Sequence, residues 1–150
     1  MKRPDSICGA LMAAALLAAA GCDGKPKLVA VTGVVKLDGK PVNGVRVYFW
    51  PKDSTAKTSV TQLAIGFSDK EGRFSLRGTN GDGIAAGDYK VTFARPMTRA
   101  GKATDKQNQK PEEVGAQESL PPSLTDPQLT TYTATVSEAS NRFDFDLPSK

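Results

Sequence analysis

In VRVYFW, at residues 45–50, every second side chain is a valine or a phenylalanine, and an arginine, a tyrosine and a tryptophan alternate with them. Successive side chains of a β-strand point to opposite faces of the sheet. One face of this stretch therefore carries Val45, Val47 and Phe49, and the other carries Arg46, Tyr48 and Trp50. The pattern predicts a strand whose first face lies in a hydrophobic core.

Comparable apolar runs flank this stretch, and turn-forming residues separate them. Asp38-Gly39 between two apolar runs is the strongest short hairpin signal, and residues 68–72 predict a turn between neighbouring antiparallel strands. No segment after residue 22 has the period of a helix. The sequence thus predicts an all-β fold, an antiparallel seven-stranded β-sandwich. Its other strands are expected within 28–37, 63–67, 74–76, 89–93, 132–136 and 143–147.

The N-terminus has the organisation of an export signal. A basic MKR start is followed by a mostly apolar stretch at 7–20, which is the length of a signal peptide core and too short for a transmembrane helix. The stretch ends in LAAAGC at residues 17–22, which resembles the signal of bacterial lipoproteins. The resemblance implies a signal peptide at 1–21 and a mature chain that begins at an acylated Cys22. The alternative is an ordinary secretory signal that leaves Cys22 as a free thiol.

Lipidation of Cys22 implies a protein anchored by fatty acids such as palmitate in the cell envelope, with its domain outside the cytoplasm. Asp23 resembles an inner-membrane retention signal of some bacteria, but the choice of membrane stays open. The lipidated N-terminus and a short tether occupy residues 22–27, and the five residues after Cys22 span at most about 17 Å. Lys25 and Lys27 either add about 1 kcal/mol each of attraction to anionic headgroups or are simply solvated.

Residues 28–150 are expected to form the folded domain, and four of its motifs carry a family resemblance. They are VTGVVKLDGKPV (31–42), VRVYF (45–49), DKEGRF (69–74) and GDYKVT (87–92). Together they resemble the carboxypeptidase regulatory-like domain, which implies a transthyretin-like (prealbumin-like) sandwich. The tail from residue 120 to 147 resembles the last strands of bacterial lipoproteins built as a single domain of this kind.

A long segment at 96–130 interrupts the strand pattern. Its first half has almost no large apolar residue, and such sequence cannot bury itself. We therefore expect a long, flexible loop there. The second half, from residue 120 to 129, carries leucines and prolines that are expected to pack along the sandwich edge and protect it from pairing.

The composition argues against catalysis and against nucleic-acid binding. The chain has no histidine and only two cysteines, so the common catalytic triads and metal sites have no residues to form them. A net charge of +4 without a basic cluster gives no nucleic-acid surface. The transthyretin-like hydrolases use histidines and a Tyr-Arg-Gly-Ser tail, and this chain ends in FDLPSK. We expect no catalytic residue, no cofactor and no metal.

Two surface patterns deserve a functional interpretation. Asp69, Glu71 and Asp82 are acidic, but a calcium loop would place glutamate where Gly78 stands, and a plain turn explains the pattern better. The second pattern is the outer face of residues 45–50.

Arg46, Tyr48 and Trp50 are residue types enriched in binding hot spots, and they form the candidate binding surface. The alternative is that Trp50 closes the end of the sandwich beneath a loop at 55–61, because tryptophan is usually largely buried. The predicted function is a lipid-anchored, non-catalytic binding or structural module of the cell envelope, with protein–protein interaction as its expected role. A carbohydrate- or peptide-binding lipoprotein that uses this surface is the alternative.

Overall fold

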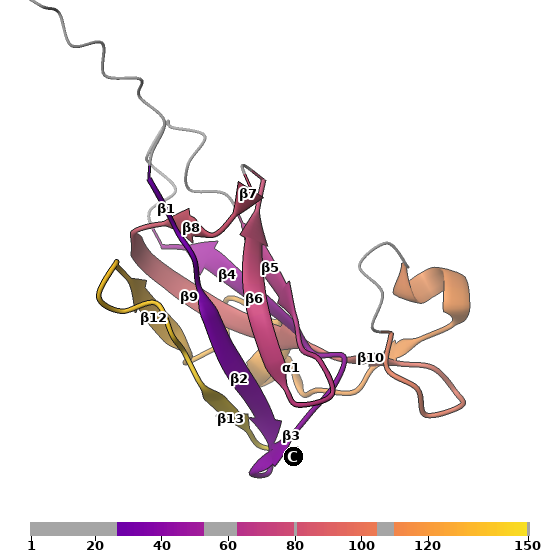
Figure 1. Ribbon diagram of the computed structural model, residues 1–150. Helices are drawn as coiled ribbons and strands as arrows, with labels where there is room; N and C mark the ends of the chain where they lie inside the picture. Colours follow the sequence, from indigo (N-terminus) through magenta and orange to yellow (C-terminus); the bar gives the residue numbers. More distant parts are fainter. Residues whose placement is uncertain (1–26, 53–62, 80, 105–109, 150) are drawn as a thin grey trace, which may run out of the picture.

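The computed structural model describes residues 27–52, 63–79, 81–104 and 110–149. Most regular structure within these ranges is β-strand (Figure 1). The elements are β1 (Leu28–Val29), β2 (Thr32–Leu37), β3 (Lys40–Pro41), β4 (Arg46–Pro51), β5 (Ala64–Phe67), β6 (Arg73–Gly78), β7 (Gly81–Asp82), β8 (Ile84–Ala85), β9 (Gly87–Ala94), β10 (Pro96–Met97), the 3-10 helix η1 (Pro111–Val114), β11 (Gln117–Glu118), α1 (Pro122–Thr125), β12 (Thr133–Val136) and β13 (Phe145–Leu147). None of the helices within those ranges has the length and apolar character needed to span a membrane.

One large sheet contains most of the strands. Its seven main strands follow the hydrogen-bonded order β12-β9-β4-β5-β6-β2-β13, and the short β3 and β7 pair with β2 and β6. Every pair in this sheet is antiparallel except β2 with β13. The hairpin predicted at Asp38-Gly39 is confirmed, since it joins β2 to β3, and the predicted turn at 68–72 joins the paired strands β5 and β6.

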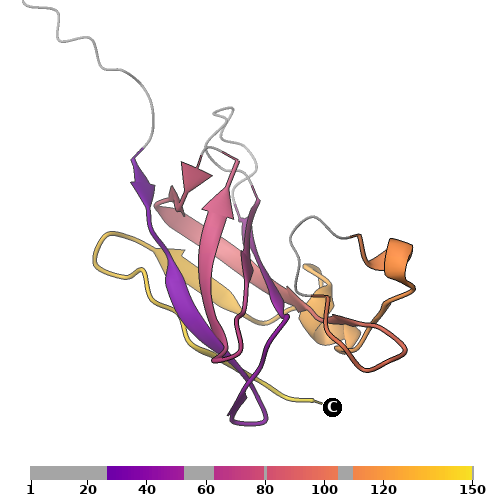
Figure 2. The same cartoon turned by 45° about the vertical axis from the view of Figure 1, so that its right-hand side comes forward.

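The sheet curls, so that strands far apart in its order pack face to face (Figure 2). Phe93 on β9 and Phe145 on β13 have ring centroids 5.0 Å apart, and the ring of Tyr132 lies against both. Edge-on contacts of this kind are the favoured geometry between aromatic rings. The all-β prediction is therefore confirmed, and the core lies between the two halves of a single curled, sandwich-like sheet.

The alternation of β4 follows the predicted pattern. Val47 and Phe49 are completely buried, whereas Arg46, Tyr48 and Trp50 are partly exposed on the other face. The neighbouring β5 also alternates, and its buried residues are the small Ala64 and Gly66. Its larger apolar residues therefore lie on the same outer face as the three β4 side chains.

The last strand differs from the antiparallel prediction. β13 runs parallel to β2, and the parallel pairing begins with a bridge between Thr32 and Arg142. The backbone N–H of Asp38 donates to the carbonyl of Leu147 at 2.9 Å, and that of Gly39 donates to Asp146 Oδ1 at 2.8 Å. Burial alternation fixes which side chains face the core, but it leaves the direction of the pairing open.

The segment at 96–130 also differs from the prediction of a loop, because its described parts contain hydrogen-bonded elements. β10 pairs with β11, and η1 lies between them in the chain. We call residues 96–104 and 110–119 the arm, and Figure 1 shows the arm projecting from the side of the sheet. In the second half, Leu120 and Leu124 belong to the buried core as expected, whereas Leu129 is exposed.

Candidate functional site

The structure describes some of the predicted site residues and not others. Cys22 and the tether up to Pro26 lie outside the described residues. The described chain starts at Lys27, and β1 begins directly after it. The three β4 residues, by contrast, are all described and lie on one sheet face.

Strand register defines the surroundings of the β4 residues. Tyr48 lies between Thr92 of β9 and Ile65 of β5, and Trp50 lies opposite Lys90 of β9. Residues directly opposite each other on neighbouring strands point to the same face of a sheet. The outer face therefore combines aromatic, aliphatic and basic side chains.

Trp50 is held in place by two contacts. Its indole Nε1–H donates a hydrogen bond of 2.8 Å to Thr92 Oγ1, and its ring stacks on Tyr48 with centroids 6.2 Å apart and planes inclined by 27°. Thr92 is buried, so the hydrogen bond ties the indole to the sheet. The indole is nevertheless partly exposed. The loop proposed to cover it, residues 55–61, lies outside the described residues.

Arg46, at the other end of the row, contacts both β5 and the arm. Its guanidinium carbon lies 5.6 Å from the centre of the Phe67 ring, within the range of a cation–π contact. Its Nη2 donates to the Oγ1 of the buried Thr104 at 3.4 Å. The candidate surface is therefore divided: Arg46 joins the sheet to the arm, whereas Tyr48 and Trp50 form a stacked pair.

Sequence reasoning missed three residues of this face, Ile65, Phe67 and Lys90. Ile65 and Phe67 are apolar and alternate, so they have the pattern of core residues, and only the register with β4 places them outside. The alternation within its own strand separates Lys90 from Tyr89 and Val91, but its position beside Trp50 depends on the β4–β9 pairing. No signal within a single strand could have located any of them.

The acidic turn between β5 and β6 is organised by its own hydrogen bonds. Asp69 Oδ1 accepts the backbone N–H groups of Glu71 and Arg73 at 3.0 and 2.8 Å, and Asp69 Oδ2 pairs with the Arg73 guanidinium. Desolvation acts to raise the pKa of Asp69, but the hydrogen bonds and the positive charge of Arg73 outweigh it and hold that pKa below its ordinary value. Within the described part of the chain, no three acidic, histidine or cysteine side chains gather as metal ligands would.

Two open concavities lie away from the stacked aromatic pair. The larger, about 610 Å³, is in the arm, between the 98–100 and 114–117 segments. The smaller, about 300 Å³, lies beside the acidic turn and is lined by Asn43, Phe67 and residues 68–70.

The comparisons with known proteins are sparse. No family model and no curated protein matches the chain. Two solved structures are similar: the major pilin subunit BcpA of Bacillus cereus, with 14% identity and a TM-score of 0.40, and a variant of that subunit, with 13% identity and a TM-score of 0.43. Each match covers 82% of this chain, which spans 30% of the pilin chain.

Proposed function

We propose that this chain is a lipid-anchored, non-catalytic binding module of the bacterial cell envelope. The observation that carries the proposal is the short distance in sequence between the lipoprotein-like LAAAGC and the first strand: β1 begins at Leu28, with only the DGKPK tether after Cys22. The domain would then fold directly beside the membrane to which Cys22 is attached.

In this proposal residues 1–21 are a cleaved lipoprotein signal peptide, residues 22–27 are the acylated N-terminus and tether, and residues 28–150 are a carboxypeptidase regulatory-like, transthyretin-like sandwich. The all-β fold and the two confirmed turns support the domain assignment. A chain without histidine, whose cysteines are Cys8 in the signal and Cys22 at the anchor, fits binding better than catalysis.

The anchor is tested by two cysteine variants expressed in a bacterium. Cys22→Ser removes the acceptor sulfur, so we expect it to lose labelling by a fatty acid analogue and to leave the membrane fraction. Cys8→Ser is the matched control, because it lies within the signal and should keep both labelling and membrane attachment. Mass spectrometry of the N-terminal peptide reads out the acyl group directly. Acylation that persists in Cys22→Ser, or its absence from the unaltered chain, would contradict the proposal.

The binding partner is proposed to be another envelope protein, with a carbohydrate as the second candidate. Stacked, partly exposed Tyr48 and Trp50 favour the second candidate, since sugar rings pack on aromatic faces. We expect affinity capture from intact envelopes to retrieve the same protein with the unaltered chain and with Trp50→Ala. Glycan-array binding that Trp50→Ala abolishes, with no protein captured, would instead establish the carbohydrate function.

A further inference from the structure

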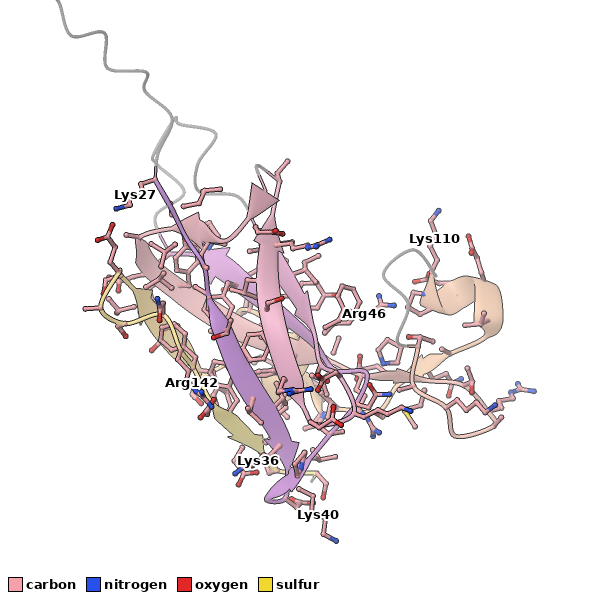
Figure 3. All side chains as sticks on the ribbon, in the orientation of Figure 1. Lys27, Lys36, Lys40, Arg46, Lys110 and Arg142 are labelled. Carbon is pink, nitrogen blue, oxygen red and sulfur yellow. The ribbon has the colours of Figure 1, made fainter. Side chains whose placement is uncertain are left out.

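The short tether restricts which end of the domain faces the membrane. Six residue steps separate Cys22 from Leu28, a reach of at most about 20 Å. Lys27, next to Leu28, lies at the end of the molecule opposite Lys36 and Lys40 (Figure 3). If Cys22 is acylated, the end with Lys27 is therefore the membrane-facing end.

Hydrogen bonds and register show which other residues belong to that end. Leu28 pairs with Ala85 of β8, and three residues further along the chain the carbonyl of Asp88 accepts the N–H of Lys52 at 2.9 Å. Lys52 directly follows β4, so the end of β4 that carries Trp50 lies at the same end of the molecule as β8, the partner of β1 (Figure 1).

The side chains at this end suit a membrane surface. Tryptophan and tyrosine concentrate at the headgroup level of bilayers, where an amphipathic ring contacts both apolar and polar groups. Basic residues beside them are attracted to anionic lipids. Within the described residues, neither Lys52 nor Lys90 takes part in an ion pair.

Two of the acidic groups at the same end are paired with basic side chains. Glu138 pairs with Lys27, and Asp82 pairs with Arg77 at 3.0 Å. Asp88 accepts a hydrogen bond from the hydroxyl of Thr135. Lys90 Nζ donates a hydrogen bond to the carbonyl oxygen of Pro127 at 3.0 Å, which does not neutralise its positive charge. Lys90, opposite Trp50 on β9, and Lys52, two residues after Trp50, therefore both keep a positive charge that attracts an external anion.

We propose that the surface formed by Tyr48, Trp50, Lys52 and Lys90 rests on the anionic headgroups of the anchoring membrane. The inference depends on the proposed lipid anchor and adds a second membrane contact to it. This contact fixes the orientation of the domain. The β2–β3 and β5–β6 turns then face away from the membrane, towards envelope partners.

The single tryptophan of the chain, Trp50, reports this contact directly. The full acylated chain is reconstituted into vesicles of phosphatidylcholine alone or mixed with phosphatidylglycerol, and Trp50 emission is quenched with acrylamide, an uncharged aqueous quencher, or with lipids brominated near the headgroup. We expect the anionic vesicles to remove most of the acrylamide quenching and to introduce quenching by the brominated lipid. The double variant Lys52→Glu/Lys90→Glu should regain acrylamide quenching. Lys36→Glu/Lys40→Glu, at the opposite end, is the charge-matched control and should behave like the unaltered chain.

Acrylamide quenching that is equal in detergent and in anionic vesicles would overturn the inference. So would shielding of Trp50 by soluble glycan fragments in detergent together with full exposure in vesicles, which would assign the surface to a carbohydrate. Vesicle flotation separates these results from failure of the anchor. A chain that floats through Cys22 but keeps Trp50 exposed retains the anchor and loses only this contact, whereas a chain that is not acylated loses both.

Discussion

Gly33 shows how one residue allows two strands to approach closely. A Cβ at this position would lie 1.8 Å from the carbonyl oxygen of Phe143 and 2.7 Å from the ring of Phe74. The nearest atom belongs to the backbone, so a side-chain rotation cannot relieve the clash. Glycine inside a strand pattern indicates a bulge or a close backbone approach, but the pattern alone does not name Phe143 as the neighbour.

We expect Gly33→Ala to lower the free energy of unfolding by about 1–3 kcal/mol or more, the range of overpacked cores. The matched control is Gly39→Ala, where a Cβ meets nothing within 4 Å but φ is +77°; it should cost only the left-handed backbone strain, about 1–2 kcal/mol. Urea unfolding of the two variants, followed by circular dichroism, measures both effects. Equal stability of Gly33→Ala and the unaltered chain would mean that β2 and the 141–143 segment lie further apart in solution.

At the scale of elements, the sequence predicted the strands better than their neighbours. The alternation in β4 identified its buried and outer faces from one strand alone, because the period of a strand is a local property. The outer position of Ile65 and Phe67 and the parallel direction of β13 depend on pairing between distant segments, which composition does not encode. The sequence therefore predicted the outer face of β4. It missed the neighbouring residues on β5 and β9, which are Ile65, Phe67 and Lys90.

The arm was the largest difference, and its base explains why it folds despite its polar sequence. The carboxylate of Glu118 accepts backbone N–H groups from Arg95, Ser119 and Leu120, each at 2.8 Å. The hydroxyl of Ser119 in turn donates to the carbonyl of Arg95 at 2.7 Å. Charge-assisted hydrogen bonds of this kind satisfy backbone donors without any apolar burial. Hydrophobic periodicity detects only burial, so it could not indicate this element.

For the molecule as a whole, stability depends on one shared core. No cysteine follows Cys22, so a disulfide cannot contribute to the folded domain. The core cluster includes side chains from the sheet together with Leu120 and Leu124 from the segment before β12. A domain with a single core is expected to unfold in one cooperative transition. The sheet and α1 should therefore lose structure together.

Leu124→Ala tests whether α1 belongs to this cooperative unit. Leu124 is 3% exposed, and Leu129, only five positions later, is 56% exposed. Truncating a buried leucine removes its transfer free energy and leaves a cavity, so we expect Leu124→Ala to lower the free energy of unfolding by about 2–5 kcal/mol. Leu129→Ala is the control in the same segment and should change it by less than about 0.5 kcal/mol. Both are made in the Cys22→Ser chain, and urea unfolding is followed by Trp50 fluorescence and by circular dichroism. Coincident transitions with the expected difference place α1 in the common core, whereas equal stability of the two variants would show that the segment detaches from the sheet in solution.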